Sequence, residues 1–324
     1  MKYVRMLLYL VALLVVNAWA HPVIIANPAP LLDTGTVESR AASPEPAALS
    51  RDDHQPQRWA IERIEAVPAR EAAETKRPVT AAILDTGVAG DDPELDDMIV
   101  ARVNFTADPS TDDLYGHGTH MAGTVAAVAP DCRLMNIKVA DDDGRCESSV
   151  VARGITSAVY HGADIVNVSL CTQGSPELEE AVDYAWANGA VVIAAAGNTG
   201  TSNPSYPACY ENCIAVAGTD EHDRLAALSN HGDWVDVAAP GARIYGQLPG
   251  GEYGYKSGTS SATAHVSGIA ALVFSVAQDR NGNCRINDEV RQAIEEGCAP
   301  IGVDGTGCGL VNALKAVSCF LSDC

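Results

Sequence analysis

The chain has 324 residues, which accommodates one large domain or two small ones. Its hydrophobic content is 47% and its mean hydropathy is near zero, so its composition is that of a globular protein and argues against an integral membrane protein. The formal net charge is −21, and residues 1–50 contribute none of it, because three basic and three acidic residues cancel there. An acidic surface of this kind repels nucleic acid and anionic lipid, so we expect neither as a partner.

The first twenty residues are typical of a secretory signal peptide. Lys2 and Arg5 form a basic start, residues 6–16 are an unbroken apolar run, and residues 18–20 (Ala-Trp-Ala) form a cleavage site with small residues at its two ends. The alternative is an uncleaved membrane anchor, but the apolar run is shorter than the ~20 residues that a membrane-spanning helix needs. We therefore expect a secreted, extracellular protein with no membrane association.

All ten cysteines lie after the signal segment, and none is part of a C-x-x-C pair. An even number of cysteines in an exported chain favours disulfides over a metal site. The sequence alone determines no connectivity, although Cys209 and Cys213 are close enough to close one loop.

Residues 21–55 are rich in Pro, Ala, Ser and Asp and have no sustained apolar period, which predicts a short pro-segment or linker. From Trp59 onward, apolar runs of strand length alternate with helical stretches, so we expect one domain over residues 56–324. Its predicted fold is α/β with three layers: a mostly parallel sheet with helices on both faces.

The predicted strands are Val79–Leu84, Arg133–Val139, Ile165–Leu170, Ala190–Ala195 and Cys213–Ala217, and most of them are continuous Val, Ile and Ala runs. The predicted helices lie near 117–129, 148–161, 176–188 and 288–296, together with a long helix after Ser260. Within this last helix, the stretch Ile269–Phe274 is apolar on every side, so it should be buried.

Four short segments carry candidate chemistry. An apolar strand delivers Asp85 to a turn in AAILDTG (81–87), and His117 begins a helix rich in small residues in YGHGTHMAGTVAAVA (115–129). Ser260 stands just before the long helix in SGTSSATAHVSG (257–268), and Asn198 ends the strand VVIAAAGN (191–198). A serine nucleophile needs a base to accept its proton and an acidic group to orient that base. Asp85, His117 and Ser260 supply these groups, and the amide of Asn198 can donate to an oxyanion.

These segments resemble the signature blocks of the subtilisin-like serine peptidases, the subtilases, in the order Asp, His, Ser. The similarity extends from about Trp59 to about Val317. The resemblance implies a secreted serine endopeptidase that works through an acyl-enzyme, with Ser260 as nucleophile, His117 as base and then acid, and Asp85 as orienter. It also implies that Asn198 contributes ~3–4 kcal/mol to the oxyanion hole, a magnitude measured in subtilisin.

Family members bind a polypeptide substrate as an extended strand between two segments of the enzyme. By position, the resemblance places substrate contacts on residues of three segments, namely Gly144, Arg145, Cys146, Ser169, Leu170, Cys171, Ala195, Ala196 and Gly197. Five acidic residues near these segments (Asp112, Asp113, Asp141, Asp142, Asp143) suggest a preference for basic residues before the cut. The small residues of the pocket fit a broad apolar preference equally well.

Two other functions remain open at this point. A catalytically inactive relative would bind peptides without cutting them, although every catalytic group is present. The string LLDTGT at Asp33 resembles an aspartic-peptidase motif, and Asp-Thr-Gly occurs again at Asp85. Only 52 residues separate these two aspartates, where a whole lobe is expected, so this alternative is disfavoured.

We expect no required cofactor, no catalytic metal and a monomer. Many subtilases carry a calcium-binding loop after the histidine helix, but the connection here is short, although Glu94 lies near the place of one ligand. A second partial calcium motif comprises Asp279, Asn281, Asn283 and Ile286, with Cys284 where glycine is required and Val290 where glutamate should end the loop. A polar turn before the next helix is the simpler interpretation. The pro-segment is also shorter than the folded prodomain of many relatives.

Overall fold

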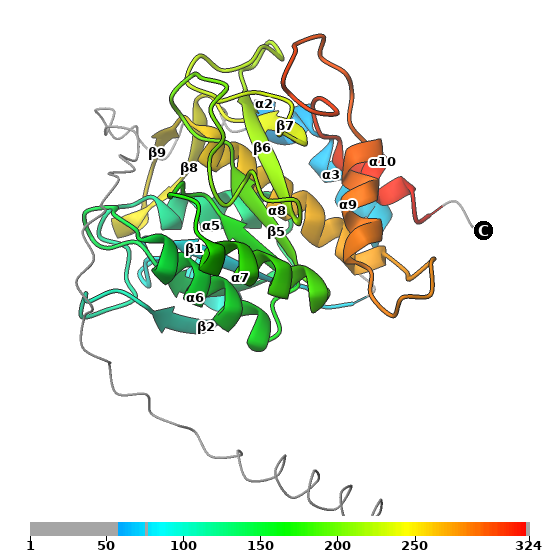
Figure 1. Cartoon of the computed structure of the whole chain (residues 1–324). Helices are drawn as coiled ribbons and strands as arrows, with labels where there is room; N and C mark the ends of the chain where they lie inside the picture. The colour runs from blue at the N-terminus through cyan, green and yellow to red at the C-terminus, as the bar shows by residue number, and fades with distance from the viewer. Residues whose placement is uncertain (1–57, 75–76, 322–324) are drawn as a thin grey trace, which may run out of the picture. The chain divides into compact units, whose positions relative to one another are not determined.

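The computed structural model describes residues 58–74 and 77–321, and within these ranges a seven-stranded parallel sheet forms the centre of the domain (Figure 1). Its strand order is β2-β3-β1-β4-β5-β6-β7, and every neighbouring pair is parallel. The strands are β1 (Thr80–Asp85), β2 (Ile99–Asn104), β3 (Arg133–Lys138), β4 (Ile165–Val168), β5 (Val191–Ala195), β6 (Cys213–Thr219) and β7 (Val237–Pro240). The predicted signal peptide and pro-segment, residues 1–55, lie outside the described residues.

Helices cover both faces of this sheet, which confirms the predicted three-layer α/β fold. The helices are α2 (Arg58–Arg63), α3 (Ala66–Ala73), α4 (Pro93–Met98), α5 (Gly118–Val128), α6 (Ser148–Tyr160), α7 (Pro176–Ala187), α8 (Thr259–Val276), α9 (Asn287–Glu296) and α10 (Ala313–Ser318). Alternate residues of β1 point to opposite faces. Ala81 and Ile83 pack with α5 and α8, whereas Ala82 and Leu84 pack with α6.

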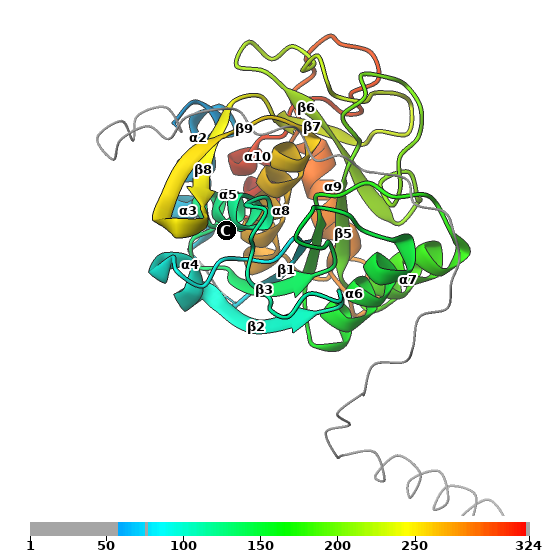
Figure 2. The same cartoon turned by 90° about the vertical axis from the view of Figure 1, so that its left-hand side faces the viewer.

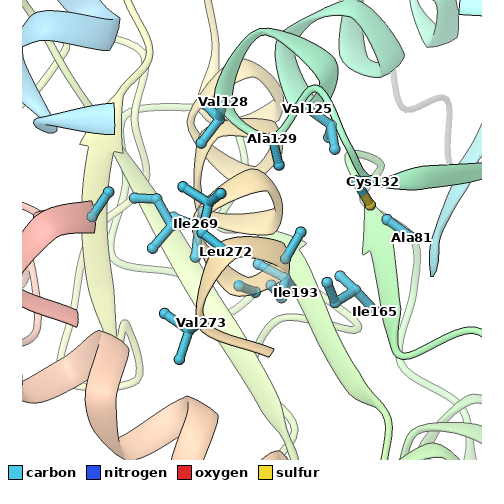
Figure 3. Packing of buried hydrophobic residues seen from close by; sticks show 14 of the residues in the cluster. Ala81, Val125, Val128, Ala129, Cys132, Ile165, Ile193, Ile269, Leu272 and Val273 are labelled. Atoms are coloured by element: carbon cyan, nitrogen blue, oxygen red, sulfur yellow. The ribbon is translucent and has the colours of Figure 1, made fainter. Parts of the chain in front are cut away.

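Helix α8 is the central element of the larger hydrophobic core. All of its residues are buried, and Figure 3 shows Ile269, Leu272 and Val273 among side chains of α5 and the sheet. Because α8 contacts neighbours on every side, it carries apolar residues all round rather than along one stripe. Among the described residues, α8 alone is long and apolar enough to cross a membrane, and it lies wholly inside the domain.

The predicted strands and helices are confirmed, with ends that differ by a few residues. Strands β2 and β7 were not predicted, nor was the antiparallel hairpin of β8 (Ile244–Leu248) and β9 (Glu252–Lys256), which are joined by the short 3₁₀ helix η1 (Pro249–Gly251). Helices α2, α3, α4 and α10 were not predicted either. The hairpin packs beside α5 (Figure 2) and so borders the helix that carries His117 at its start.

Candidate active site

Asp85 and His117 come together at the carboxyl edge of the parallel sheet, where chemistry gathers in open α/β folds. Asp85 is the last residue of β1 and is fully buried, and His117 is the residue just before α5. Nδ1 of His117 lies 2.7 Å from Oδ1 of Asp85. Since a carboxylate only accepts hydrogen bonds, Nδ1 carries the proton, which leaves Nε2 of a neutral imidazole as an acceptor.

Asp113 fixes the loop that leads into His117, and the sequence analysis had assigned it no such role. Its side chain is 1% exposed and accepts hydrogen bonds from the residues around the histidine. The donors are the N–H and hydroxyl of Thr119 (2.8 and 2.7 Å), the N–H of Gly116 (2.7 Å), the N–H of Tyr115 (3.2 Å) and the hydroxyl of Thr86 (2.7 Å). These contacts connect the turn after Asp85 to the first turn of α5, so Asp113 sets the position of both candidate residues.

Ser260 is the second residue of α8, and its hydroxyl donates to the backbone carbonyl of Ser169 at 2.8 Å. The hydroxyl of Ser169 donates back to the carbonyl of Ser260 at 3.0 Å. Within the described residues, the structure shows no hydrogen bond between the Ser260 hydroxyl and the His117 imidazole. The serine side chain is therefore turned toward the segment after β4, and it must rotate about its Cα–Cβ bond to reach an imidazole.

Asn198 lies three residues after β5 and is oriented by Thr259. Its amide oxygen accepts the N–H of Thr259 at 2.8 Å and the Thr259 hydroxyl at 3.1 Å. The Thr259 hydroxyl in turn accepts the N–H of Gly197 at 3.1 Å. Because the oxygen of the amide is engaged in this way, the NH₂ group is the end of Asn198 that remains to donate.

Two of the three predicted substrate-binding segments come together beside Ser260. Ser169–Cys171 contacts Ser260 through Ser169, and the thiol of Cys171 donates to the carbonyl of Ala195 at 3.5 Å. This contact joins Ser169–Cys171 to the third segment, Ala195–Gly197.

The remaining predicted segment, Gly144–Cys146, lies beside the loop before His117. A side chain on Gly144 would meet the ring of Tyr115 at 3.0 Å, and φ at Gly144 is +78°, so both the space and the backbone conformation favour glycine. Cys146 forms an antiparallel bridge with Ala140. Each predicted segment is thus placed near a predicted catalytic residue.

The acidic residues that suggested a basic substrate preference are mostly engaged within the protein. Asp113 is buried, Asp142 accepts a hydrogen bond from Lys138 at 2.8 Å, and Asp143 pairs with Arg145 at 2.6 Å. Lys138 is itself fully buried and also donates to the carbonyl of Thr86 at 2.6 Å. The negative charge of Asp142 therefore offsets the positive charge of the buried Lys138.

Three basic side chains in this part of the structure have pKa values that are lowered by burial. Burial lowers the pKa of His120 to about 3 and that of His265 to about 4, so both imidazoles are neutral in the folded protein. His120 bonds to the carbonyl of Ile244 at 3.0 Å and so fastens the β8–β9 hairpin to α5. Burial also lowers the pKa of Lys256, whereas the negative charges of Asp113 and Asp85 act in the opposite direction.

Only residues 129–132 separate α5 from β3, so the connection after the histidine helix is short, as the sequence indicates. Among residues 58–74 and 77–321, no three His, Cys, Asp or Glu side chains are grouped so that they could hold a metal ion. No disulfide joins the cysteines in the same ranges, so the disulfide prediction is not confirmed. Burial raises the pKa of the Cys132 and Cys298 thiols to about 12.

A parallel sheet with helices on both faces, and with a paired Asp and His at its carboxyl edge, defines a subtilisin-like α/β protein. The subtilase family model matches residues 76–301. The chain belongs to the subtilase family, and it is a serine endopeptidase.

Three relatives illustrate this similarity. The thermophilic serine proteinase of Bacillus sp. (strain AK1) is 43% identical over 251 residues, which cover 73% of this chain and 61% of that protein. Thermitase of Thermoactinomyces vulgaris is 43% identical over 250 residues, 73% of this chain and 87% of thermitase. Subtilisin BL of Lederbergia lenta is 39% identical over 273 residues, 80% of this chain and 97% of that protein.

Proposed function

We propose that the chain hydrolyses peptide bonds through an acyl-enzyme in which Ser260 is the nucleophile, His117 the general base and then acid, and Asp85 the orienting carboxylate. The 2.7 Å contact between Asp85 and His117 carries this proposal, because it fixes the tautomer that accepts a proton at Nε2. The domain over residues 56–324 is the catalytic domain in this proposal, and no cofactor takes part in the reaction.

The reaction begins when the Ser260 hydroxyl leaves the carbonyl of Ser169 and turns toward Nε2 of His117. The imidazole takes the hydroxyl proton as the oxygen attacks the substrate carbonyl, and the buried carboxylate of Asp85 stabilises the imidazolium that forms. The imidazolium then gives its proton to the leaving amine. Water repeats the same steps on the acyl-enzyme and restores Ser260.

The oxyanion of the tetrahedral intermediate is stabilised by two donors. One is the NH₂ group of Asn198, whose oxygen end is held by Thr259. The other is the backbone N–H of Ser260, which has no acceptor within the helix because it lies in the first turn of α8. The positive end of the helix dipole adds to this stabilisation.

The substrate is a polypeptide that lies between Gly144–Cys146 and Ser169–Cys171, with Ala195–Gly197 lining the pocket for the residue before the cut. The contact of Cys171 with Ala195 supports this arrangement because it places two of the segments against each other. Cleavage of a mixed peptide library would define the preference. Because Asp113 is buried and Asp142 and Asp143 are each paired with a basic side chain of the protein, we expect apolar rather than basic residues to dominate before the cut.

Labelling with a fluorophosphonate probe tests the catalytic assignment and separates it from the alternative of an inactive peptide-binding relative. We expect the label on Ser260, its loss in Ser260→Ala, a strong reduction in His117→Ala, and full labelling of Ser261→Ala, which alters the neighbouring buried serine. The bond from Ser260 to Ser169 is the observation that favours the inactive alternative. An unlabelled wild-type chain that still binds peptides would establish that alternative.

Export and maturation form a separate part of the proposal. We infer that residues 1–20 are removed as a signal peptide, that residues 21–55 are a short pro-segment of a zymogen, and that the mature enzyme is a secreted monomer without membrane or nucleic-acid partners. The sequence of the first twenty residues supports the export step. N-terminal sequencing of material from the culture medium would test it, and a start at Met1 would contradict it.

Disulfides in the secreted enzyme remain part of this proposal. Cys209 and Cys213 lie four residues apart, and the charge of Cys209 contributes to the raised pKa of the buried Cys213. Thiol titration in denaturant, with and without prior reduction, would count the cysteines in bridges. Ten titratable thiols in unreduced secreted protein would rule out disulfides altogether.

A further inference from the structure

The connection between α8 and α9, residues 277–286, is folded around the side chain of Asp279. Oδ1 of Asp279 accepts the N–H of Gly282 at 2.7 Å, and Oδ2 accepts the N–H of Cys284 at 2.8 Å. Cys284 has φ of +65°, a left-handed conformation that in a calcium-binding loop is taken by glycine at this same position. The backbone thus adopts the turn of such a loop although the expected glycine is a cysteine.

Two carboxylates from the first turn of α9 fold back onto this loop. The amides of Asn281 and Asn283 both donate to Oδ2 of Asp288, at 2.6 and 2.8 Å. Oε1 of Glu289 accepts the N–H groups of Arg280 and Asn281, at 3.0 and 3.3 Å. Asp288 and Glu289 therefore tie the start of α9 to the loop, through two asparagine amides and two backbone N–H groups.

One oxygen of each of these carboxylates is buried and accepts no hydrogen bond. They are Oδ1 of Asp288 and Oε2 of Glu289, and the Glu289 side chain as a whole is only 7% exposed. A buried oxygen of an ionised carboxylate without a hydrogen-bond donor is unfavourable, so each of these carboxylates would gain from a cation beside it.

We propose that the loop of residues 279–289 binds a calcium ion, held by the amide oxygens of Asn281 and Asn283 and by the carboxylates of Asp288 and Glu289 of α9. The ion would neutralise these two carboxylates and occupy their unpartnered oxygens. Calcium takes six to eight oxygen ligands in flexible geometry, and carboxylate, amide and backbone oxygens are the ligands available here. Glu289 replaces the terminal glutamate, whose place in the motif is taken by the buried Val290.

The positive side chains of the loop are engaged elsewhere and leave the carboxylates to the cation. Arg280 donates to the carbonyl of Cys319 at 2.7 Å, and Arg285 donates to the carbonyl of Ala187 at 2.8 Å. Arg280, Asp288 and Glu289 also line a surface pocket, which gives an ion a route to the site.

Because no three acidic, His or Cys side chains of the described chain are grouped as a finished metal site, the amide oxygens must take part. The amide oxygens of Asn281 and Asn283 accept the N–H groups of Asn283 and Arg285, at 2.9 and 2.8 Å. An amide oxygen has two lone pairs, so it can accept a backbone N–H and bind a cation at the same time.

The site would act on stability rather than on catalysis. Ser260 is at the opposite end of α8, and an 18-residue helix is about 27 Å long. The loop joins α8 to α9, and the side chain of Asn287 ties the start of α9 to the carbonyl of Trp186 at the end of α7 at 3.0 Å. A cation here would therefore fasten the three helices together.

Thermal unfolding of the full-length chain tests this proposal, in the Ser260→Ala background to prevent self-cleavage. After removal of bound metal with a chelator, added Ca²⁺ at about a hundred times its dissociation constant should raise Tm by about 5–10 °C. Glu289→Gln should abolish this shift while leaving Tm in chelator unchanged or higher. The glutamine oxygen can still accept the two backbone N–H groups, and its NH₂ can donate to Asp288.

The matched control is Glu180→Gln, which alters an exposed glutamate of α7 and should keep the full calcium shift. Asp288→Asn is a second variant at the site and should lose the shift as well. Calorimetric titration with Ca²⁺ should show one binding event fewer in Glu289→Gln than in the parent. A parent chain without any calcium shift would overturn the proposal, and so would a Glu289→Gln chain that retains the parent's shift.

Discussion

The backbone N–H of Thr259 donates to the amide oxygen of Asn198 at 2.8 Å, and this bond determines which end of the asparagine can reach a substrate. In the proposed mechanism, the NH₂ group of Asn198 is thereby oriented for the oxyanion at Ser260 before substrate binds. Preorganised donors of this kind stabilise charge that develops in the transition state more than charge in the ground state.

Asn198→Ala should reduce kcat about 10²–10³-fold with little change in KM, a magnitude measured for an oxyanion-hole asparagine of subtilisin, a member of the same family. Steady-state kinetics on a peptide substrate would measure it. The exposed Asn203 provides the control, since Asn203→Ala should leave both constants unchanged. An unaltered kcat in Asn198→Ala would remove this residue from the mechanism.

Asp85→Asn should separate catalysis from stability. An asparagine cannot hold His117 in the tautomer that accepts a proton at Nε2, so kcat should fall about 10⁴-fold. Stability should not fall, because Oδ2 of Asp85 is buried without a hydrogen-bond partner and the variant removes a buried charge. Kinetics together with urea unfolding would give both quantities. A loss of unfolding free energy as large as that of a core truncation would contradict the expectation.

Asp113 should be a positioning residue, because its contacts are with the loop around His117 and not with a substrate. Asp113→Ala would leave several buried N–H and hydroxyl donors without an acceptor, so the free energy of unfolding should fall by about 2–4 kcal/mol. kcat should fall as the imidazole loses its fixed place, while KM stays nearly constant.

The conservative Asp113→Asn variant distinguishes this positioning role from a merely structural one. It retains one acceptor oxygen and should recover part of the lost kcat. Asp112→Asn alters the exposed neighbouring carboxylate and should match the wild type in stability and kinetics. If Asp113→Ala lowers stability but leaves kcat intact, the residue serves the fold alone.

Stability should fall from about pH 7 to about pH 3 because of His120 and His265. Their folded pKa values of about 3 and about 4 lie below the unfolded value near 6.5, so the unfolded chain binds more protons in this range. The loss begins as pH falls through the unfolded pKa and ends below the folded pKa. At pH 5 each histidine should cost about 2 kcal/mol relative to pH 8.

Urea unfolding of the Ser260→Ala chain at both pH values would measure this loss. His265→Gln should shrink the difference between pH 8 and pH 5 by about 2 kcal/mol, whatever its effect at pH 8. His222→Gln alters an exposed side chain and should leave the difference unchanged. An equal pH dependence in His265→Gln and the parent would refute the assignment.

Much of the sheet could be predicted from the sequence because its central strands are buried on both faces. Most of β1 and β3 to β6 is apolar, although β3 (RLMNIK) and β4 (IVNV) also carry buried polar residues, and each strand was predicted with an error of a few residues. The edge strand β2 (IVARVN) is half exposed and mixes charge with apolar residues, and β7 has only four residues and ends in proline. Strands of this kind form because they pair with neighbouring strands, and their sequences lack the apolar run that identifies a buried strand.

The candidate site likewise contains residues that the sequence indicates and contacts that only the fold reveals. Asp85, His117, Ser260 and Asn198 follow buried strands or begin helices in recognisable segments, so the sequence could indicate them. Asp113 is one acidic residue among several in a polar stretch, and only the fold reveals that it is buried beneath Thr86 and Thr119. The bond of Ser260 to Ser169 joins residues 91 positions apart and has no local signal.

The enclosure of α8 has a consequence for how the chain acquires its structure. This helix lies near the end of the sequence, yet it packs on β1, β4, β5 and β6, which are synthesised much earlier. Translation adds about 5–20 residues per second, so the apolar side chains that β1 presents to α8 stay uncovered for roughly ten seconds or more after β1 is made. Contacts between such distant parts of a chain also form slowly. The nascent protein must therefore be protected from aggregation until its last third has emerged.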